Sequence, residues 1–124
     1  MRAMVDNCMA TSFKAEPIDE NTFLVSVAGD LDLSSSPAFR RILEASGEIG
    51  GQLIVSLEGC NYCDSSGLIQ LIRTAKQLGS RLRIVVAEKS PLNRLFNLAG
   101  VDLPVVHTLE TAVLPLRPVV PTEF

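Results

Sequence analysis

The first third of the chain has the alternating pattern of apolar and polar residues that β-strands show. Residues 11–17 and 22–29 are two β-prone segments joined by four residues, and alternation places Phe23, Val25 and Val27 on one face of the second segment. This arrangement predicts a β-hairpin.

Three later segments are short and almost continuously apolar: residues 53–57, 82–86 and 103–106. Such runs are typical of strands that are buried on both faces of a sheet. We therefore expect three more strands after the hairpin.

Apolar residues recur at helical spacing between and after these strands. Phe39, Ile42 and Leu43 predict a first helix, with Ser36 as its cap, Pro37 at its first position and three glycines at its end. A second helix is predicted by a stripe that ends before Gly79 and consists of Leu68, Leu71, Ile72, Ala75 and Leu78. Residues 90–100 predict a third helix, with Ser90 as its cap, and residues 108–114 predict a short fourth one.

A hairpin followed by alternating helices and strands predicts an α/β fold. We expect a single domain with a mixed sheet, in which the later strands are parallel and linked by right-handed crossovers. Binding sites in such sheets lie where strands end and helices begin. Residues 64–67 occupy such a junction.

Composition agrees with one soluble, globular domain. The chain has 124 residues, of which 47% are hydrophobic and 20% charged. No apolar run approaches the roughly 18 residues that a membrane span needs, and the N-terminus does not resemble a signal peptide. Three cysteines do not suggest a secreted disulfide scaffold, so we expect a cytoplasmic protein.

The net charge of −3 is distributed unevenly. Residues 16–64 carry nine acids against two arginines, whereas residues 65–100 carry six basic residues against one acid. Neither part is basic enough for nucleic-acid binding, and aromatic residues make up only 5% of the chain. The pattern favours an acidic face that meets another protein.

The junction at Asp64, Ser65 and Ser66 admits several interpretations. A helix cap would explain one polar residue. A serine nucleophile is not favoured, because Cys63 replaces the first glycine of the hydrolase motif and His107 is the one histidine that could serve as base. Phosphorylation of Asp64, as in receiver domains, remains an alternative, although the segment after the last predicted strand has no lysine.

Three segments resemble the signatures of the STAS domain: Gly-Asp-Leu-Asp at 29–32, Cys-Asp-Ser-Ser-Gly-Leu-Ile-Gln-Leu-Ile at 63–72, and Ser-Pro-Leu-Asn-Arg-Leu-Phe-Asn-Leu-Ala-Gly at 90–100. More narrowly, they are similar to those of bacterial anti-sigma factor antagonists. The similarity covers residues 12–114, which leaves 1–11 as an N-terminal segment and 115–124 as a proline-rich tail.

This resemblance implies a switch. In the family, the serine directly after the aspartate, here Ser65, is phosphorylated by an anti-sigma factor that is itself a serine kinase. The unphosphorylated antagonist binds that kinase and releases a sigma factor, and a serine phosphatase resets the cycle. We expect a phosphate on Ser65 to meet free backbone N–H groups at the helix N-terminus.

The resemblance further implies a binding module without catalytic residues, cofactor or metal. Its partner surface would consist of Asp30, Asp32, Asp64, Ser65, Ser66 and Gly67. Besides the receiver-like domain, a second alternative is a STAS subunit of a larger regulatory or lipid-transport assembly that works by the same surface.

The chain departs from the family at two places. Cys60 and Cys63 replace apolar residues and create a Cys-x-x-Cys spacing, which we interpret as two small buried packing residues, since two thiols do not complete a zinc site. The proline-rich end replaces the longer final helix that is common in the family.

Overall fold

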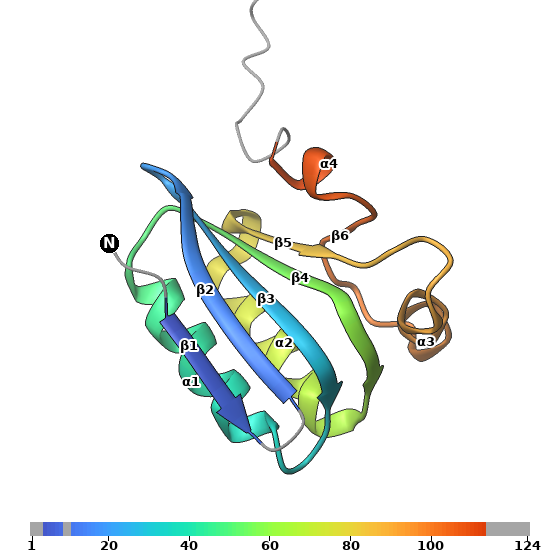
Figure 1. The fold of residues 1–124 in the computed structure, drawn as a ribbon. Helices are drawn as coiled ribbons and strands as arrows, with labels where there is room; N and C mark the ends of the chain where they lie inside the picture. The colour runs from blue at the N-terminus through green and yellow to red at the C-terminus, as the bar shows by residue number, and fades with distance from the viewer. Residues whose placement is uncertain (1–3, 9–10, 114–124) are drawn as a thin grey trace, which may run out of the picture.

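The computed structural model describes residues 4–8 and 11–113. Within them the chain folds into a mixed sheet with helices packed against it (Figure 1). The proline-rich tail predicted for residues 115–124 lies outside the described residues. Among the described residues, no helix combines the length and the apolar character that crossing a membrane requires.

Among the described residues the sheet has six strands, and their order in space is their order along the chain. The strands are β1 (Met4–Cys8), β2 (Thr11–Asp19), β3 (Thr22–Leu31), β4 (Gln52–Cys63), β5 (Leu82–Val85) and β6 (Val105–Val106). β1, β2 and β3 are antiparallel neighbours, and β3 to β6 are parallel. The predicted hairpin is β2 and β3, and the predicted mixed sheet is confirmed.

Strand β1 was not predicted from the sequence. It lies in the segment that the resemblance left outside the domain, and it pairs with β2 from Met4↔Ala15 to Cys8↔Thr11. The expected last strand is shorter than predicted, because pairing with β5 involves only Val105 and Val106.

Strand β4 continues well beyond its predicted end at residue 57. Two irregularities lengthen it: where β3 advances from Ser26 to Ala28, β4 advances from Ser56 to Gly59, and a second extra residue precedes Tyr62. Each β-bulge turns the strand and shifts its alternation. As a result, buried positions on β4 recur every third residue at Leu57, Cys60 and Cys63.

In the part of the chain that the structure describes, four α-helices and one 3₁₀ turn connect or follow the strands. They are α1 (Ser36–Glu48), α2 (Ser65–Leu78), η1 (Gly79–Arg81), α3 (Pro91–Ala99) and α4 (Leu109–Val113). The sequence signals of α3 are confirmed, with Ser90 as N-cap, Pro91 in the first turn and Gly100 left-handed after the end. The prediction for α1 was one residue late, since Ser35 holds the N-cap position and Ser36 is already helical.

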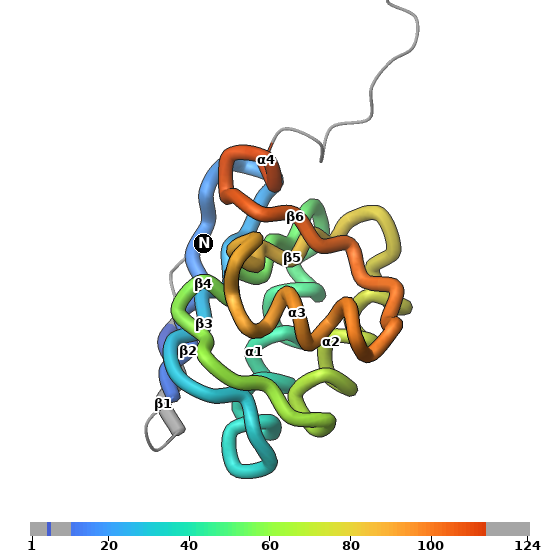
Figure 2. Tube along the Cα trace, turned by 90° about the vertical axis from the view of Figure 1, so that its right-hand side faces the viewer, coloured from blue at the N-terminus to red at the C-terminus, as the bar shows by residue number. Residues whose placement is uncertain are grey.

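The main core lies between one face of the sheet and α1 and α2, where the views show both helices (Figures 1 and 2), and it also includes Leu92 and Phe96 of α3. The stacked rings of Phe13 on β2 and Phe39 on α1, with centroids 5.5 Å apart, lie in this core. A smaller cluster on the opposite face joins Ile54 and Val85 to Ala112 of α4.

Helix α2 lies close to the sheet at Gly67, which is buried. A Cβ atom at this position would lie 2.8 Å from Leu31 Cβ and 3.0 Å from Cys63 Sγ. Leu31 Cβ belongs to a buried strand and cannot move without the backbone. Gly67 therefore sets the distance between the start of α2 and the ends of β3 and β4.

We predict that Gly67→Ala lowers the free energy of unfolding. Overpacking costs about 1–3 kcal/mol, which outweighs the roughly 1 kcal/mol that alanine gains over glycine within a helix. The matched control is Gly47→Ala in α1, where the new Cβ would meet Leu78 at 3.6 Å, an ordinary contact. Urea denaturation should show a loss for Gly67→Ala and a gain or no change for Gly47→Ala, and equal behaviour of the two variants would contradict the account.

Candidate functional site

The candidate site forms where β3 and β4 end side by side. These strands are parallel, so their carboxyl ends lie at the same edge of the sheet, with Leu31 paired to Cys63. The Asp64 N–H donates to the Leu31 carbonyl at 2.9 Å. The loop from β3 to α1 and the junction from β4 to α2 are therefore adjacent, and the structure brings the predicted aspartates and serines together.

Asp64 is the N-cap of α2, which confirms the capping interpretation. Its backbone is extended, and its Oδ1 accepts hydrogen bonds from Ser66 N at 2.9 Å and Gly67 N at 3.2 Å. The Ser66 hydroxyl donates to the same oxygen at 2.5 Å. The pKa of the Asp64 carboxyl is lowered, first by the Ser66 hydroxyl and then by the two amides, so the group is charged at neutral pH.

The two adjacent serines have different surroundings. Ser65 is exposed, and its hydroxyl makes no hydrogen bond with any residue that the structure describes. Ser66 is half-buried, and its hydroxyl donates to Asp64 and accepts from Ser36 Oγ at 3.0 Å. One hydroxyl is thus open to solvent, and the other is held in the interior of the site.

The β3–α1 loop is organised by a second aspartate. Asp32 Oδ1 accepts from the Ser34 hydroxyl at 2.7 Å and from the backbone N–H groups of Ser34 and Ser35, each at 3.1 Å. These hydrogen bonds, the Ser34 hydroxyl first, lower the pKa of Asp32. Asp30 has an exposed side chain, and its carbonyl accepts from Thr11 Oγ1 at 2.8 Å and Ser35 Oγ at 2.9 Å.

Ser36 is not the cap that the sequence predicted. It is buried in the first turn of α1, and its hydroxyl contacts the Asp32 carbonyl at 2.8 Å as well as Ser66 Oγ. The sequence contained a signal for this contact, because both loops have an aspartate followed by a run of serines. That signal does not by itself say which hydroxyls meet.

Exposed apolar side chains accompany the acids, and sequence reasoning missed them. Leu33, Tyr62 and Ile69 are 77%, 53% and 50% exposed, respectively. Tyr62 pairs in register with Asp30, and Ile69 lies one helical turn after Ser65 on the same side of α2. Leu33 and Ser66 line one shallow depression of about 460 Å³. These three side chains belong to the same end of the molecule as Ser65.

Cys60 and Cys63 lie beneath this surface as free, buried thiols, which confirms their predicted burial. Their sulfur atoms contact the carbonyl oxygens of Tyr62 and Asp64 at 3.2 and 3.5 Å. Burial raises the pKa of both thiols, that of Cys63 to about 12. Both are therefore protonated at neutral pH, in keeping with packing residues.

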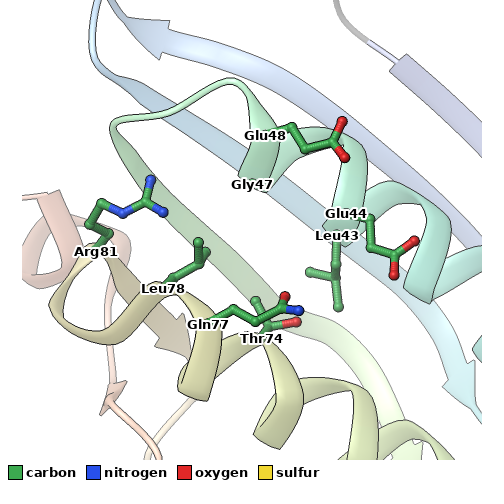
Figure 3. Close-up of a pocket in the computed structure, with 8 residues that line it drawn as sticks. All are labelled: Leu43, Glu44, Gly47, Glu48, Thr74, Gln77, Leu78 and Arg81. Atoms are coloured by element: carbon green, nitrogen blue, oxygen red, sulfur yellow. The ribbon is translucent and has the colours of Figure 1, made fainter.

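A separate groove of about 440 Å³ lies between the C-terminal halves of α1 and α2 (Figure 3). Its charged lining comes from Glu44, Glu48 and Arg81, and its apolar lining includes Leu43 and Leu78. None of the predicted site residues lines this groove. His107, considered above as a base, instead contacts the Val86 carbonyl at 2.9 Å through Nδ1.

We predict that Asp64→Ala lowers the free energy of unfolding by about 1 kcal/mol at pH 7, as loss of an N-cap usually does. Because the folded-state pKa of Asp64 is depressed, its contribution is present above the ordinary value of 3.8 and disappears as the pH falls through the folded-state pKa. Urea denaturation at pH 7 and in acid measures the difference. Asp102→Ala, an exposed acid, is the control, and a gap between parent and Asp64→Ala that persists in acid would contradict the prediction.

Comparison with known proteins agrees with this geometry. The family model described as "Mlab, STAS domain" matches residues 15–111. The anti-sigma-B factor antagonist of Bacillus subtilis (strain 168) is 32% identical over 85 residues, which are 66% of this chain and 77% of that protein.

Several solved structures are similar over most of the chain, including the following two. An anti-sigma factor antagonist from Mycobacterium paratuberculosis has a TM-score of 0.77 at 25% identity, covering 87% of this chain and 95% of that one. The Bacillus cell fate determinant SpoIIAA in its phosphorylated form has a TM-score of 0.63 at 20% identity, covering 85% of this chain and 99% of that one. The matched family model spans the sheet from β2 onward together with both loops of the candidate site, and the chain belongs to the STAS domain family.

Proposed function

We propose that this chain is an anti-sigma factor antagonist controlled by phosphorylation of Ser65. Unphosphorylated, it binds an anti-sigma factor that is a serine kinase and so releases a sigma factor for transcription. Phosphorylation ends that binding, and a serine phosphatase restores it. The similarity to the Bacillus subtilis and Mycobacterium paratuberculosis antagonists supports this assignment.

The observation that carries the proposal is the difference between the two serines. A kinase needs a hydroxyl that can enter its active site and lose a proton. Ser65 Oγ is exposed and makes no hydrogen bond with the described residues, whereas Ser66 Oγ is held by Asp64 and Ser36. The geometry thus favours Ser65 as the acceptor.

A phosphate on Ser65 would have less local support than the sequence suggested. The amides of Ser66 and Gly67 already donate to Asp64, so they are not free to bind a phosphate. The helix dipole favours the new charge by roughly 0.3–1 kcal/mol, and the Asp64 carboxylate opposes it. Because these effects partly cancel, we expect the fold to be nearly unchanged by phosphorylation.

The effect on a bound partner is much larger. A phosphate adds about −1.5 to −2 charges, and two like unit charges at about 4 Å repel by about 4 kcal/mol at an effective dielectric constant near 20. Each loss of roughly 1.4 kcal/mol in binding free energy weakens the affinity tenfold. Even part of this repulsion energy would therefore weaken binding about a hundredfold. Asp30, Asp32 and Asp64 make the surface negative before phosphorylation, so the charges that repel the phosphate are the chain's own carboxylates, and a docked partner strengthens this repulsion by excluding water.

The exposed apolar side chains suit the same role. Leu33, Tyr62 and Ile69 would be buried by a docked partner, and apolar or aromatic anchors of this kind contribute most to binding at protein interfaces. The proposed partner surface therefore consists of Asp30, Asp32, Asp64, Ser65, Ser66 and Gly67 together with these apolar neighbours. The proposed surface binds a protein. Catalysis, a cofactor, a metal and nucleic acid are not part of the proposal. Because the proposed role is in the control of transcription, the proposal includes a location in the cytoplasm.

The alternatives have less support. A receiver-like role would require the Asp64 carboxylate to attack a phosphoryl group, yet one of its oxygens accepts three hydrogen bonds from the start of α2. A STAS subunit of a larger regulatory or lipid-transport assembly would use the same surface. Copurification from the native cell and identification of the bound protein separate that assembly from an anti-sigma factor.

We predict a single, acid-stable phosphate on Ser65 after incubation with the copurified kinase and ATP. The site is mapped by mass spectrometry in the parent, in Ser65→Ala and in Ser66→Ala. Ser65→Ala should lose the label and Ser66→Ala should keep it on Ser65. Phosphate on Ser66 of the parent would refute the assignment, and an acid-labile phosphate would favour Asp64.

We further predict that Ser65→Asp lowers the affinity for the kinase at least tenfold, while its melting temperature moves by only a few degrees. Ser12→Asp is the matched control, because it adds the same charge at an exposed position on the sheet face opposite the core. It should bind like the parent. Global unfolding of Ser65→Asp would mean that the switch acts through stability instead of electrostatic repulsion.

A further inference from the structure

Ser36 makes a contact that connects the two loops of the candidate site through their side chains. The one proton of its Oγ has two acceptors within reach, the Asp32 carbonyl oxygen at 2.8 Å and Ser66 Oγ at 3.0 Å. Ser66 Oγ in turn donates to Asp64 Oδ1. Because the Ser66 proton is committed to Asp64, Ser66 can only accept from Ser36, and Ser36 shares its one proton between Ser66 and the Asp32 carbonyl.

This shared proton matters because Ser36 belongs to α1 and Asp64 caps α2. Ser36 is only 5% exposed and contacts the β3–α1 loop through the Asp32 carbonyl. The orientation of the Ser66 hydroxyl therefore depends on a residue that is 30 positions away in the sequence. A disturbance at the first turn of α2 can reach the loop that carries Asp32 and Leu33 by this route.

We propose that Ser36 is a positioning residue for the switch. Through Ser66 it orients the Asp64 carboxylate, and it couples the first turn of α2 to the β3–α1 loop, so that a charge placed on Ser65 alters both parts of the partner surface together. The role of Ser36 in regulating partner binding rests on the proposed function. The coupling itself rests on the hydrogen bonds among Ser36, Ser66, Asp32 and Asp64.

A serine that only fills space would affect stability and nothing else. The chain offers a matched control for that case in Ser46, which lies on the same helix, is 2% exposed, and has an Oγ without a hydrogen-bond partner among the described residues. Ser46→Ala removes the same atom from a similarly buried place without breaking a hydrogen bond.

The experiment introduces Ser65→Asp into three backgrounds, the parent, Ser36→Ala and Ser46→Ala, and compares backbone amide resonances by NMR. In the parent we expect the new charge to shift amides of residues 32–36 as well as those of residues 65–67. In the Ser36→Ala background the response of residues 32–36 should fall by at least half, and in the Ser46→Ala background it should persist. An equal response in all three backgrounds overturns the proposal.

A second measurement follows the carboxyl group of Asp64 by NMR titration. The Ser66 hydroxyl lowers the pKa of Asp64, and the neighbouring Asp32 carboxylate raises it. Ser36→Ala should raise the pKa of Asp64 part of the way toward that of Ser66→Ala, and Ser46→Ala should leave it unchanged. If Ser36→Ala does not fold, Ser66→Ala replaces it in the first experiment, because it breaks the same connection from the other end. In the Ser66→Ala background, an undiminished response of residues 32–36 to Ser65→Asp overturns the proposal.

Neither measurement uses a kinase, so the two proposals fail separately. Absence of phosphate on Ser65 would remove the proposed function and leave the coupling intact. Identical behaviour of Ser36→Ala and Ser46→Ala would remove the coupling and leave the proposed function intact.

Discussion

The hydrogen bonds of the Asp64 carboxylate govern the geometry of this end of the molecule. One oxygen accepts two backbone N–H groups and a hydroxyl, which requires an extended backbone at Asp64 and fixes where α2 begins. Once that start is fixed, Gly67 faces Leu31 and Cys63 at a distance that excludes a side chain. Ser65 is then turned away from the sheet, because the residues before and after it, Asp64 and Ser66, are held against the sheet.

The same interaction gives the surface a permanent charge. Hydrogen bonding lowers the pKa of both Asp32 and Asp64, so neither carboxyl gains a proton near neutral pH. Leu33, Tyr62 and Ile69 are exposed around these charges, and a partner protein with apolar groups can cover them. A surface that is already negative responds strongly to further negative charge only when water is excluded, that is, in the complex.

Much of the fold was readable from the sequence because it depends on local signals. The hairpin follows from alternation, the ends of α3 from Ser90, Pro91 and Gly100, and the cap of α2 from Asp64. Strand β1 and the extension of β4 were missed for a different reason, since each depends on pairing with a distant segment. The N-cap of α1 was predicted at Ser36, one residue too late, because Asp32 organises the preceding turn through hydrogen bonds that helix propensity does not describe.

The two bulges of β4 have a consequence for insertions and deletions. Between the pairs Thr22↔Gln52 and Leu31↔Cys63, β3 uses ten residues and β4 uses twelve. Substitutions in this stretch change side chains and leave the spacing intact. Loss of one residue before Cys63 would shift every later residue by one position, which would place Asp64 where Cys63 is buried and a thiol at the surface. The orientation of the phosphoacceptor proposed here is therefore determined by the number of residues in β4 as well as by their identity.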